Sequence, residues 1–138
     1  MSRITLIIGG ARAGKSDLAQ RMALAAGGPV TVIATATAGD DDMRRRIARH
    51  RAERPAGWVT AEEPTDLASA LGAAAPGHLV IVDCLTLWTT NLVLAGVAAE
   101  AVASATGAAV RAAAARRAPV VAVTNEVGLG IVPGSSLG

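Results

Sequence analysis

Aromatic residues and cysteine are scarce in this chain of 138 residues, which contains two tryptophans, one cysteine, and no phenylalanine or tyrosine. Its core must therefore be built from valine, isoleucine, leucine and alanine. The single cysteine, Cys84, cannot form an intramolecular disulfide, and no Cys or His lies near it at a spacing typical of metal ligands. These absences exclude a disulfide-stapled fold and favour a reducing, cytoplasmic location.

Lysine is equally scarce, because twelve of the thirteen basic residues are arginine and Lys15 is the only lysine. The formal net charge is only +2 and the arginines are not interleaved with aromatic residues, so no nucleic-acid partner is expected. The apolar stretch 92–110 is interrupted by Glu100 and Ser104, and its alanines have weak affinity for a membrane. We therefore predict no membrane span.

Short runs of β-branched residues alternate with longer segments of helical character. Buried strands are predicted at 4–8, 30–34, 58–60, 79–82 and 120–123. Helices are predicted at 16–26, from 40–42 to just before Pro55, at about 64–74, at 85–94 and at 97–117. This alternation predicts an α/β fold of three layers, αβα, with a mostly parallel sheet and right-handed crossovers.

A glycine-rich segment lies between the first predicted strand and the first predicted helix. It matches the pattern G-x-x-x-x-G-K-[ST], in which backbone amides and the helix N-terminus bind phosphate oxygens. Lys15 would contact the β and γ phosphates of a nucleotide, and Ser16 would hold Mg²⁺. A chance glycine turn is the alternative, but the flanking strand and helix favour a P-loop NTPase-like fold. The predicted nucleotide-binding residues of this loop are Gly9, Gly10, Ala11, Arg12, Ala13, Gly14, Lys15 and Ser16.

Asp83 follows the apolar strand 79–82, which is where P-loop sites place a second Mg²⁺-orienting residue. The alternative is that Asp83 caps the helix predicted to begin at Leu85.

Four other side chains have simpler interpretations. Cys84 is expected to be a small buried hydrophobe, and His78 a loop histidine without a partner residue. Trp58 and Trp88 are interpreted as core or interface residues.

His50 lies on a mixed stripe of the second predicted helix together with Met43, Ile47 and Arg54. It is either a packed or capping residue or a nucleophile toward a nucleotide, whose phosphates neighbouring cations would hold close to the imidazole. The spacing alone leaves both interpretations open. The same holds for the arginines around it, which either form a solvated face or bind phosphates: Arg46, Arg49, Arg51 and Arg54.

Taken in order, these motifs resemble one family of enzymes over essentially the whole chain. The segments that match are the glycine loop 9–16, 33–36, 41–43 with 46–47, 50–51 with 54–55, Trp58 with Thr60 and Glu62, 83–88 with 91–92, and 124–133. The family is that of the bifunctional adenosylcobinamide kinase and adenosylcobinamide-phosphate guanylyltransferase of cobalamin biosynthesis.

The resemblance implies a two-step enzyme. ATP or GTP phosphorylates the aminopropanol hydroxyl of adenosylcobinamide, and GTP then guanylylates a histidine, matched here by His50, which passes GMP to adenosylcobinamide phosphate. It implies His50 and Lys15 as catalytic residues, Mg²⁺ held by Ser16 and Asp83, and a homotrimer. It also adds the following residues to the nucleotide site: Ala34, Thr35, Ala36, Arg51, Ala52, Glu53, Arg54, Glu62 and Asp83.

The family pattern continues beyond the last residues of this chain with a further helix and strand. Residues 1–138 are therefore expected to form a single P-loop nucleotide-binding domain that lacks this C-terminal helix and strand, and such a truncated chain could be inactive.

Two other functions fit the P-loop alone. One is a kinase of another small alcohol, in which His50 is structural. The other is a nucleotide-binding switch, which is disfavoured because Asp83 is not followed by Asp-x-x-Gly and because no Asn-Lys-x-Asp guanine-binding motif exists.

Overall fold

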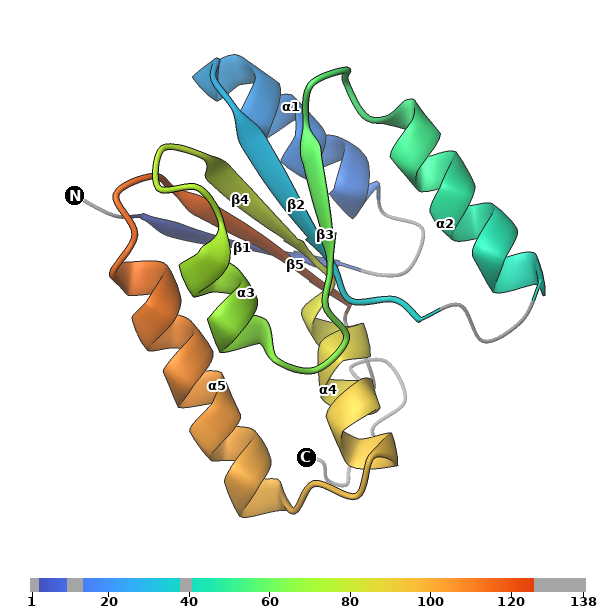
Figure 1. The fold of residues 1–138 in the computed structure, drawn as a ribbon, viewed down its shortest axis with the longest axis vertical. Helices are drawn as coiled ribbons and strands as arrows, with labels where there is room; N and C mark the ends of the chain where they lie inside the picture. Colours follow the sequence, from blue (N-terminus) through green and yellow to red (C-terminus); the bar gives the residue numbers. More distant parts are fainter. Residues whose placement is uncertain (1–2, 10–13, 38–40, 126–138) are drawn as a thin grey trace.

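The computed structural model describes residues 3–9, 14–37 and 41–125 of the chain. Within these ranges strands and helices alternate as predicted, with boundaries that differ by a few residues (Figure 1). The elements are β1 (Ile4–Gly9), α1 (Lys15–Ala26), β2 (Val30–Ala34), α2 (Asp41–Glu53), β3 (Val59–Glu62), α3 (Leu67–Ala73), β4 (Leu79–Asp83), α4 (Leu85–Leu94), α5 (Ala99–Ala114) and β5 (Val120–Asn125).

The described strands form one five-stranded sheet in the order β1-β5-β4-β2-β3. Every neighbouring pair is parallel, which confirms the predicted α/β class. Because parallel strands direct their carboxyl ends to the same edge of a sheet, the segments that follow them gather at that edge. The same topology makes β1 and β3 the edge strands of the described part of the chain.

The central strand β4 is buried on both faces because its side chains alternate between two hydrophobic clusters. Leu79 and Ile81 pack in the cluster that includes α1. Val80 and Val82 pack in the cluster that includes α3, α4 and α5. Figure 1 shows α1 on one side of the sheet and α3 and α5 on the other. A continuous apolar run is typical of a parallel strand covered by helices on both faces, so the prediction of a three-layer fold is confirmed.

The helix predicted at 97–117 is shorter in the structure. It begins after a turn in which Gly96 has a φ of +83°, and it ends at Ala114. Beyond that end, the Arg116 side chain binds α3 and the segment that follows α3. We call Arg116 and the backbone carbonyls that it binds the Arg116 clamp. The Arg116 guanidinium donates hydrogen bonds of 2.8–3.0 Å to the backbone carbonyls of Leu71, Ala74, Ala75 and His78.

The Arg116 residue is only 8% exposed, and its burial lowers the pKa of the guanidinium. Two of its partners, Leu71 O and Ala74 O, lie at the C-terminal end of α3, where the helix dipole favours a cation. Among the described residues, the Arg116 clamp therefore joins the end of α5 to α3 and to the segment after it without a carboxylate.

The structure changes the interpretation of His78 and supports that of Trp88. His78 has a partner, because its Nδ1 lies 2.8 Å from Thr31 Oγ1 in a hydrogen bond between the two side chains. The expectation of a histidine without a partner was therefore wrong, since the partner is 47 residues away in sequence. Trp88 belongs to the core as expected and donates from Nε1 to Thr65 O at 2.7 Å. Trp58 is half-buried against the α1 side of the core.

No helix in the described ranges has both the length and the apolar character that crossing a bilayer requires.

Candidate nucleotide-binding site

One row of paired residues crosses the carboxyl edge of the sheet. The strand register places in it, from β1 to β3, Ile7, Val123, Asp83, Ala34 and Glu62. Three of these residues were predicted from the sequence to contact nucleotide or metal, and they come from three neighbouring strands. The fold therefore brings Asp83, Ala34 and Glu62 to the same level of the same edge.

The glycine loop begins at this edge. Gly9 ends β1, and Gly14 precedes α1 with a φ of +73°, a backbone conformation that strongly favours glycine. Lys15 is the first residue of α1 and is only 7% exposed, which is unusual for lysine. The predicted binding residues Gly10, Ala11, Arg12 and Ala13 lie outside the described residues. Ser16 belongs to the first turn of α1, and its side chain is also outside the description.

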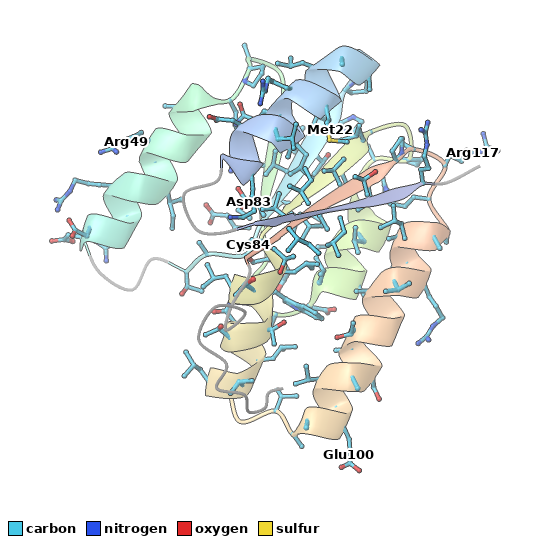
Figure 2. All side chains as sticks on the ribbon, turned by 180° about the vertical axis from the view of Figure 1, so that it is seen from behind. Met22, Arg49, Asp83, Cys84, Glu100 and Arg117 are labelled. Carbon is cyan, nitrogen blue, oxygen red and sulfur yellow. The ribbon has the colours of Figure 1, made fainter. Side chains whose placement is uncertain are left out.

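Lys15 and Asp83 both lie within electrostatic reach of the Cys84 thiol. Burial raises the pKa of Cys84, and the negative charge of Asp83 acts in the same direction. A hydrogen bond from the Leu87 amide and the positive charge of Lys15 act in the opposite direction. Figure 2 shows Asp83 and Cys84 between the first turn of α1 and the N-terminal end of α4. The start of α1, which carries Lys15, therefore lies near the acidic residue at the end of β4.

The capping alternative for Asp83 was wrong. Asp83 is the last residue of β4, and the residue that caps α4 is Cys84, whose Sγ accepts a hydrogen bond from Leu87 N at 3.5 Å. Cys84 was expected to be a small buried hydrophobe; it packs against the core as a half-buried residue and also makes a polar contact. Asp83 does not serve as the N-cap, and the prediction that it helps to bind Mg²⁺ stays open.

A groove of about 630 Å³ opens between α2 and the segments that follow β2 and β3, and we call it the α2 groove. This volume lies within the range of small-molecule binding sites, roughly 300–1,000 Å³. Its lining residues are Ala36, Thr37, Arg44, Arg45, Ile47, Ala48, Glu62 and Pro64. Two of these, Ala36 and Glu62, were predicted to contact nucleotide. Thr35, also predicted, is fully buried and does not line the groove.

The remaining predicted residues lie on or just after α2. His50, Arg51 and Glu53 are in the last turns of this helix, and their side chains lie outside the description. Ala52 is exposed. Arg54 donates from Nη1 to Thr60 Oγ1 at 3.1 Å, which joins the end of α2 to β3.

Arg49 is exposed and points away from the sheet in Figure 2. For Arg49 the structure therefore favours the interpretation of a solvated face. The side chains of Arg46 and Arg51 lie outside the description, so the choice between a solvated face and phosphate binding stays open for them.

Sequence reasoning missed six groove residues: Thr37, Arg44, Arg45, Ile47, Ala48 and Pro64. The two arginines carried a usable signal, because each follows an aspartate by three residues, a spacing that pairs side chains on one helix face. Arg44 lies 3.3 Å from Asp41, and Arg45 lies 2.6 Å from Asp42, in exposed ion pairs. Exposed pairs of this kind contribute only about 0–1 kcal/mol each, so both arginines remain available to an anionic ligand.

The donor set at the sheet edge suits Mg²⁺ bound together with a nucleotide. One carboxylate, Asp83, lies near the first turn of α1, and Mg²⁺ in such sites takes one or two protein oxygens and completes its shell with phosphate oxygens and water. Among the described residues, no group of three or more His, Cys, Asp or Glu side chains gathers in an arrangement that could hold a metal ion. An all-protein metal cage is therefore not a feature of the described part of the chain.

Comparison with known proteins gives a consistent result. Residues 5–138 match the family described as cobinamide kinase / cobinamide phosphate guanyltransferase. The chain is 49% identical over 135 residues to the bifunctional adenosylcobalamin biosynthesis protein CobP of Pseudomonas aeruginosa, a match that covers 93% of this chain and 74% of the relative. It is 40% identical over 146 residues to the bifunctional adenosylcobalamin biosynthesis protein CobU of Salmonella typhimurium, covering 96% of this chain and 80% of the relative.

Proposed function

Because the chain belongs to the cobinamide kinase / cobinamide phosphate guanyltransferase family, we propose that it phosphorylates adenosylcobinamide and transfers GMP from GTP to adenosylcobinamide phosphate. The product of the second reaction is adenosylcobinamide-GDP. One observation supports this proposal most strongly: Lys15 is almost fully buried at the start of α1, and the first turn of this helix lies near Asp83 at the carboxyl edge of the sheet. A buried ammonium group next to a glycine loop is suited to binding phosphates.

In the kinase reaction, the aminopropanol hydroxyl oxygen attacks the γ-phosphorus of ATP or GTP. A P–O bond to the acceptor forms, the bond to the β-phosphate oxygen breaks, the nucleoside diphosphate leaves, and the hydroxyl proton is lost to solvent. Lys15 neutralises charge on the β and γ phosphates, and the amides of the glycine loop fix their position. Ser16 and Asp83 would hold Mg²⁺, which neutralises further phosphate charge when it is bound.

In the guanylyltransferase reaction, His50 is the nucleophile. A neutral imidazole nitrogen attacks the α-phosphorus of GTP, so that a P–N bond forms and pyrophosphate leaves. The phosphate oxygen of adenosylcobinamide phosphate then attacks the same phosphorus, and the P–N bond breaks. A covalent intermediate divides one difficult displacement into two easier ones. The position of His50 in α2, the helix that borders the α2 groove, supports this role.

Trapping with GTP labelled at the α-phosphate tests the histidine role. We expect the unchanged chain to acquire acid-labile, base-stable label, and His50→Ala to acquire none. The matched control is His78→Ala, which changes the other histidine, in the segment before β4 and bonded to Thr31. This variant should be labelled as strongly as the unchanged chain.

Three outcomes would argue against the proposal. Label that persists in His50→Ala would exclude His50 as the nucleophile. Absence of label, with phosphate still transferred from the γ position to a small alcohol, would favour a kinase of another substrate. Hydrolysis of GTP without transfer to adenosylcobinamide would favour a nucleotide-binding switch. We also propose a homotrimer as the assembly, which light scattering after gel filtration tests directly.

A further inference from the structure

Side chains of α4 bind the segments that follow β2 and β3. Asn91 uses both N–H groups of its amide, donating from Nδ2 to Thr35 O at 2.8 Å and to Pro64 O at 2.9 Å. These two carbonyls belong to residues that are 56 and 27 positions away in sequence. A single side chain therefore holds together two segments of backbone that no strand pairing joins at this point.

Thr35 joins the end of β2 to the turn after β4. Its Oγ1 donates to Cys84 O at 2.8 Å and accepts from Cys84 N at 2.9 Å. Its own amide donates to Asp83 O at 3.1 Å. Thr35 is 0% exposed, and its two bonds to Cys84 are partly buried. The Thr35 hydroxyl therefore bonds to both the backbone amide and the backbone carbonyl of Cys84. Cys84 directly follows Asp83, the residue proposed to bind Mg²⁺.

We call Thr35 and Asn91, together with the backbone carbonyl and amide groups that they bind, the loop anchor. The segments it holds include Ala36, Thr37 and Pro64 on the wall of the α2 groove. It also fixes the Asp83–Cys84 turn, which lies next to Lys15. The anchor thus connects the two halves of the candidate site, the P-loop side and the groove side, through partly buried hydrogen bonds.

We propose that Thr35 and Asn91 are positioning residues for the nucleotide, an inference that rests on the proposed nucleotide-dependent function. Thr35 cannot contact the ligand because it is fully buried, yet it sets the position of backbone that can. Binding sites need their contacting groups held to within about 0.5 Å, and hydrogen bonds behind those groups provide this precision. Loss of the anchor therefore weakens nucleotide binding, beyond any loss of global stability.

Thr35→Val tests the hydroxyl because valine keeps the shape of threonine. We expect the Kd for GTP, measured by isothermal titration calorimetry with Mg²⁺, to rise about tenfold, since the Cys84 amide loses its acceptor and the Cys84 carbonyl keeps only the bond from the Trp88 amide. Thr35→Ser restores the hydroxyl and should return the Kd to within about twofold of the unchanged chain. The matched control is Thr89→Val on α4, an exposed residue whose hydroxyl bonds only to Leu85 O of its own helix.

Asn91→Leu removes both amide donors at nearly constant volume and should raise the same Kd by about tenfold or more. A second control separates positioning from stability. Leu71→Ala truncates a buried core residue of α3 and destabilises the fold, but it should leave the Kd unchanged once the protein is folded. Hydrogen exchange gives a measurement that needs no ligand: the Glu63 amide, bonded to Ala34 O, should exchange faster in Thr35→Val than in Thr89→Val.

The results separate the two proposals. If Thr35→Val and Asn91→Leu bind GTP as the unchanged chain does and the Glu63 amide keeps its protection, the anchor is refuted whatever the reaction is. If these variants bind GTP weakly but the unchanged chain forms no histidine adduct, the anchor stands and the guanylyltransferase mechanism falls. If Leu71→Ala raises the Kd as much as Thr35→Val does, the effect is one of stability and the positioning role is wrong.

Discussion

Replacing Arg116 by methionine tests whether a buried cation without a carboxylate partner stabilises this fold. Methionine keeps the aliphatic length of the side chain and removes all hydrogen bonds of the Arg116 clamp. The neighbouring residue offers a matched control, because Arg117 is exposed and the structure shows no hydrogen bond from its described side chain to the clamp carbonyls. Arg117→Met should change the free energy of unfolding by no more than about 0.5 kcal/mol.

The expected change in the free energy of unfolding depends on how far each carbonyl partner of Arg116 is exposed to water. The bond to Leu71 O is buried, so its loss leaves an unsatisfied acceptor at a cost of about 1–3 kcal/mol. The bonds to Ala74 O, Ala75 O and His78 O are only partly buried, so water can replace the donor and each loss costs about 0.5–1 kcal/mol. Removing the buried guanidinium also removes its desolvation cost, which offsets part of this loss. We therefore expect Arg116→Met to destabilise the fold by about 3 kcal/mol.

Urea unfolding followed by circular dichroism and by tryptophan fluorescence, from Trp58 and Trp88, measures this difference. With a slope of roughly 2 kcal/mol/M, the midpoint should fall by about 1.5 M in Arg116→Met and remain nearly constant in Arg117→Met. Agreement of the two probes establishes the two-state behaviour that the comparison needs. A loss below about 1 kcal/mol in Arg116→Met, or an equal loss in both variants, would refute the structural role assigned to the clamp.

Two further predictions concern the candidate site. Lys15→Met keeps the length of the side chain but removes its charge, so the affinity for GTP should fall about a hundredfold in calorimetry, and an unchanged affinity would contradict the phosphate role. Burial raises the pKa of Cys84 above its ordinary value of 9.0, so iodoacetamide at pH 8 should alkylate the folded chain several times more slowly than the urea-unfolded chain. Because the unfolded thiol ionises first as the pH rises, the stability contributed by Cys84 is present below about pH 9 and is lost as the pH rises through the raised pKa. Cys84→Ala should abolish that part of the pH dependence of the free energy of unfolding. If the free energy of unfolding varied with pH identically in both proteins, the thiol would not be the cause.

Local patterns in the sequence were sufficient to predict the parallel sheet and the start of α1. The strand 79–82 has an uninterrupted apolar run, and the structure buries it on both faces as β4. The loop from Gly9 to Ser16 has a spacing that few other functions require, and α1 begins where that spacing predicts. In both cases the physical cause acts over neighbouring residues, through side-chain periodicity or backbone conformation.

Other features depend on partners that are distant in sequence, and no local pattern indicates them. Arg116 follows an alanine-rich helix, so its spacing suggested one more helical turn, yet its carbonyl partners lie 38–45 residues earlier. Asn91 belonged to a recognised motif, but the motif did not show which backbone atoms its amide would bind. The α2 groove likewise forms between segments from three separate parts of the chain. Only the folded topology reveals such contacts.

β4 and β1 differ in how well they are buried, and this difference affects how the candidate site would respond to thermal fluctuations. β4 is covered on both sides and carries Asp83 at its end, whereas β1 is an outer strand with Ile4, Leu6 and Ile8 about half-exposed. Partial opening in proteins starts where few apolar contacts hold the backbone. Fraying of β1 would therefore loosen the glycine loop while the acidic side of the site kept its place, so that phosphate release need not disturb the half that is proposed to bind Mg²⁺.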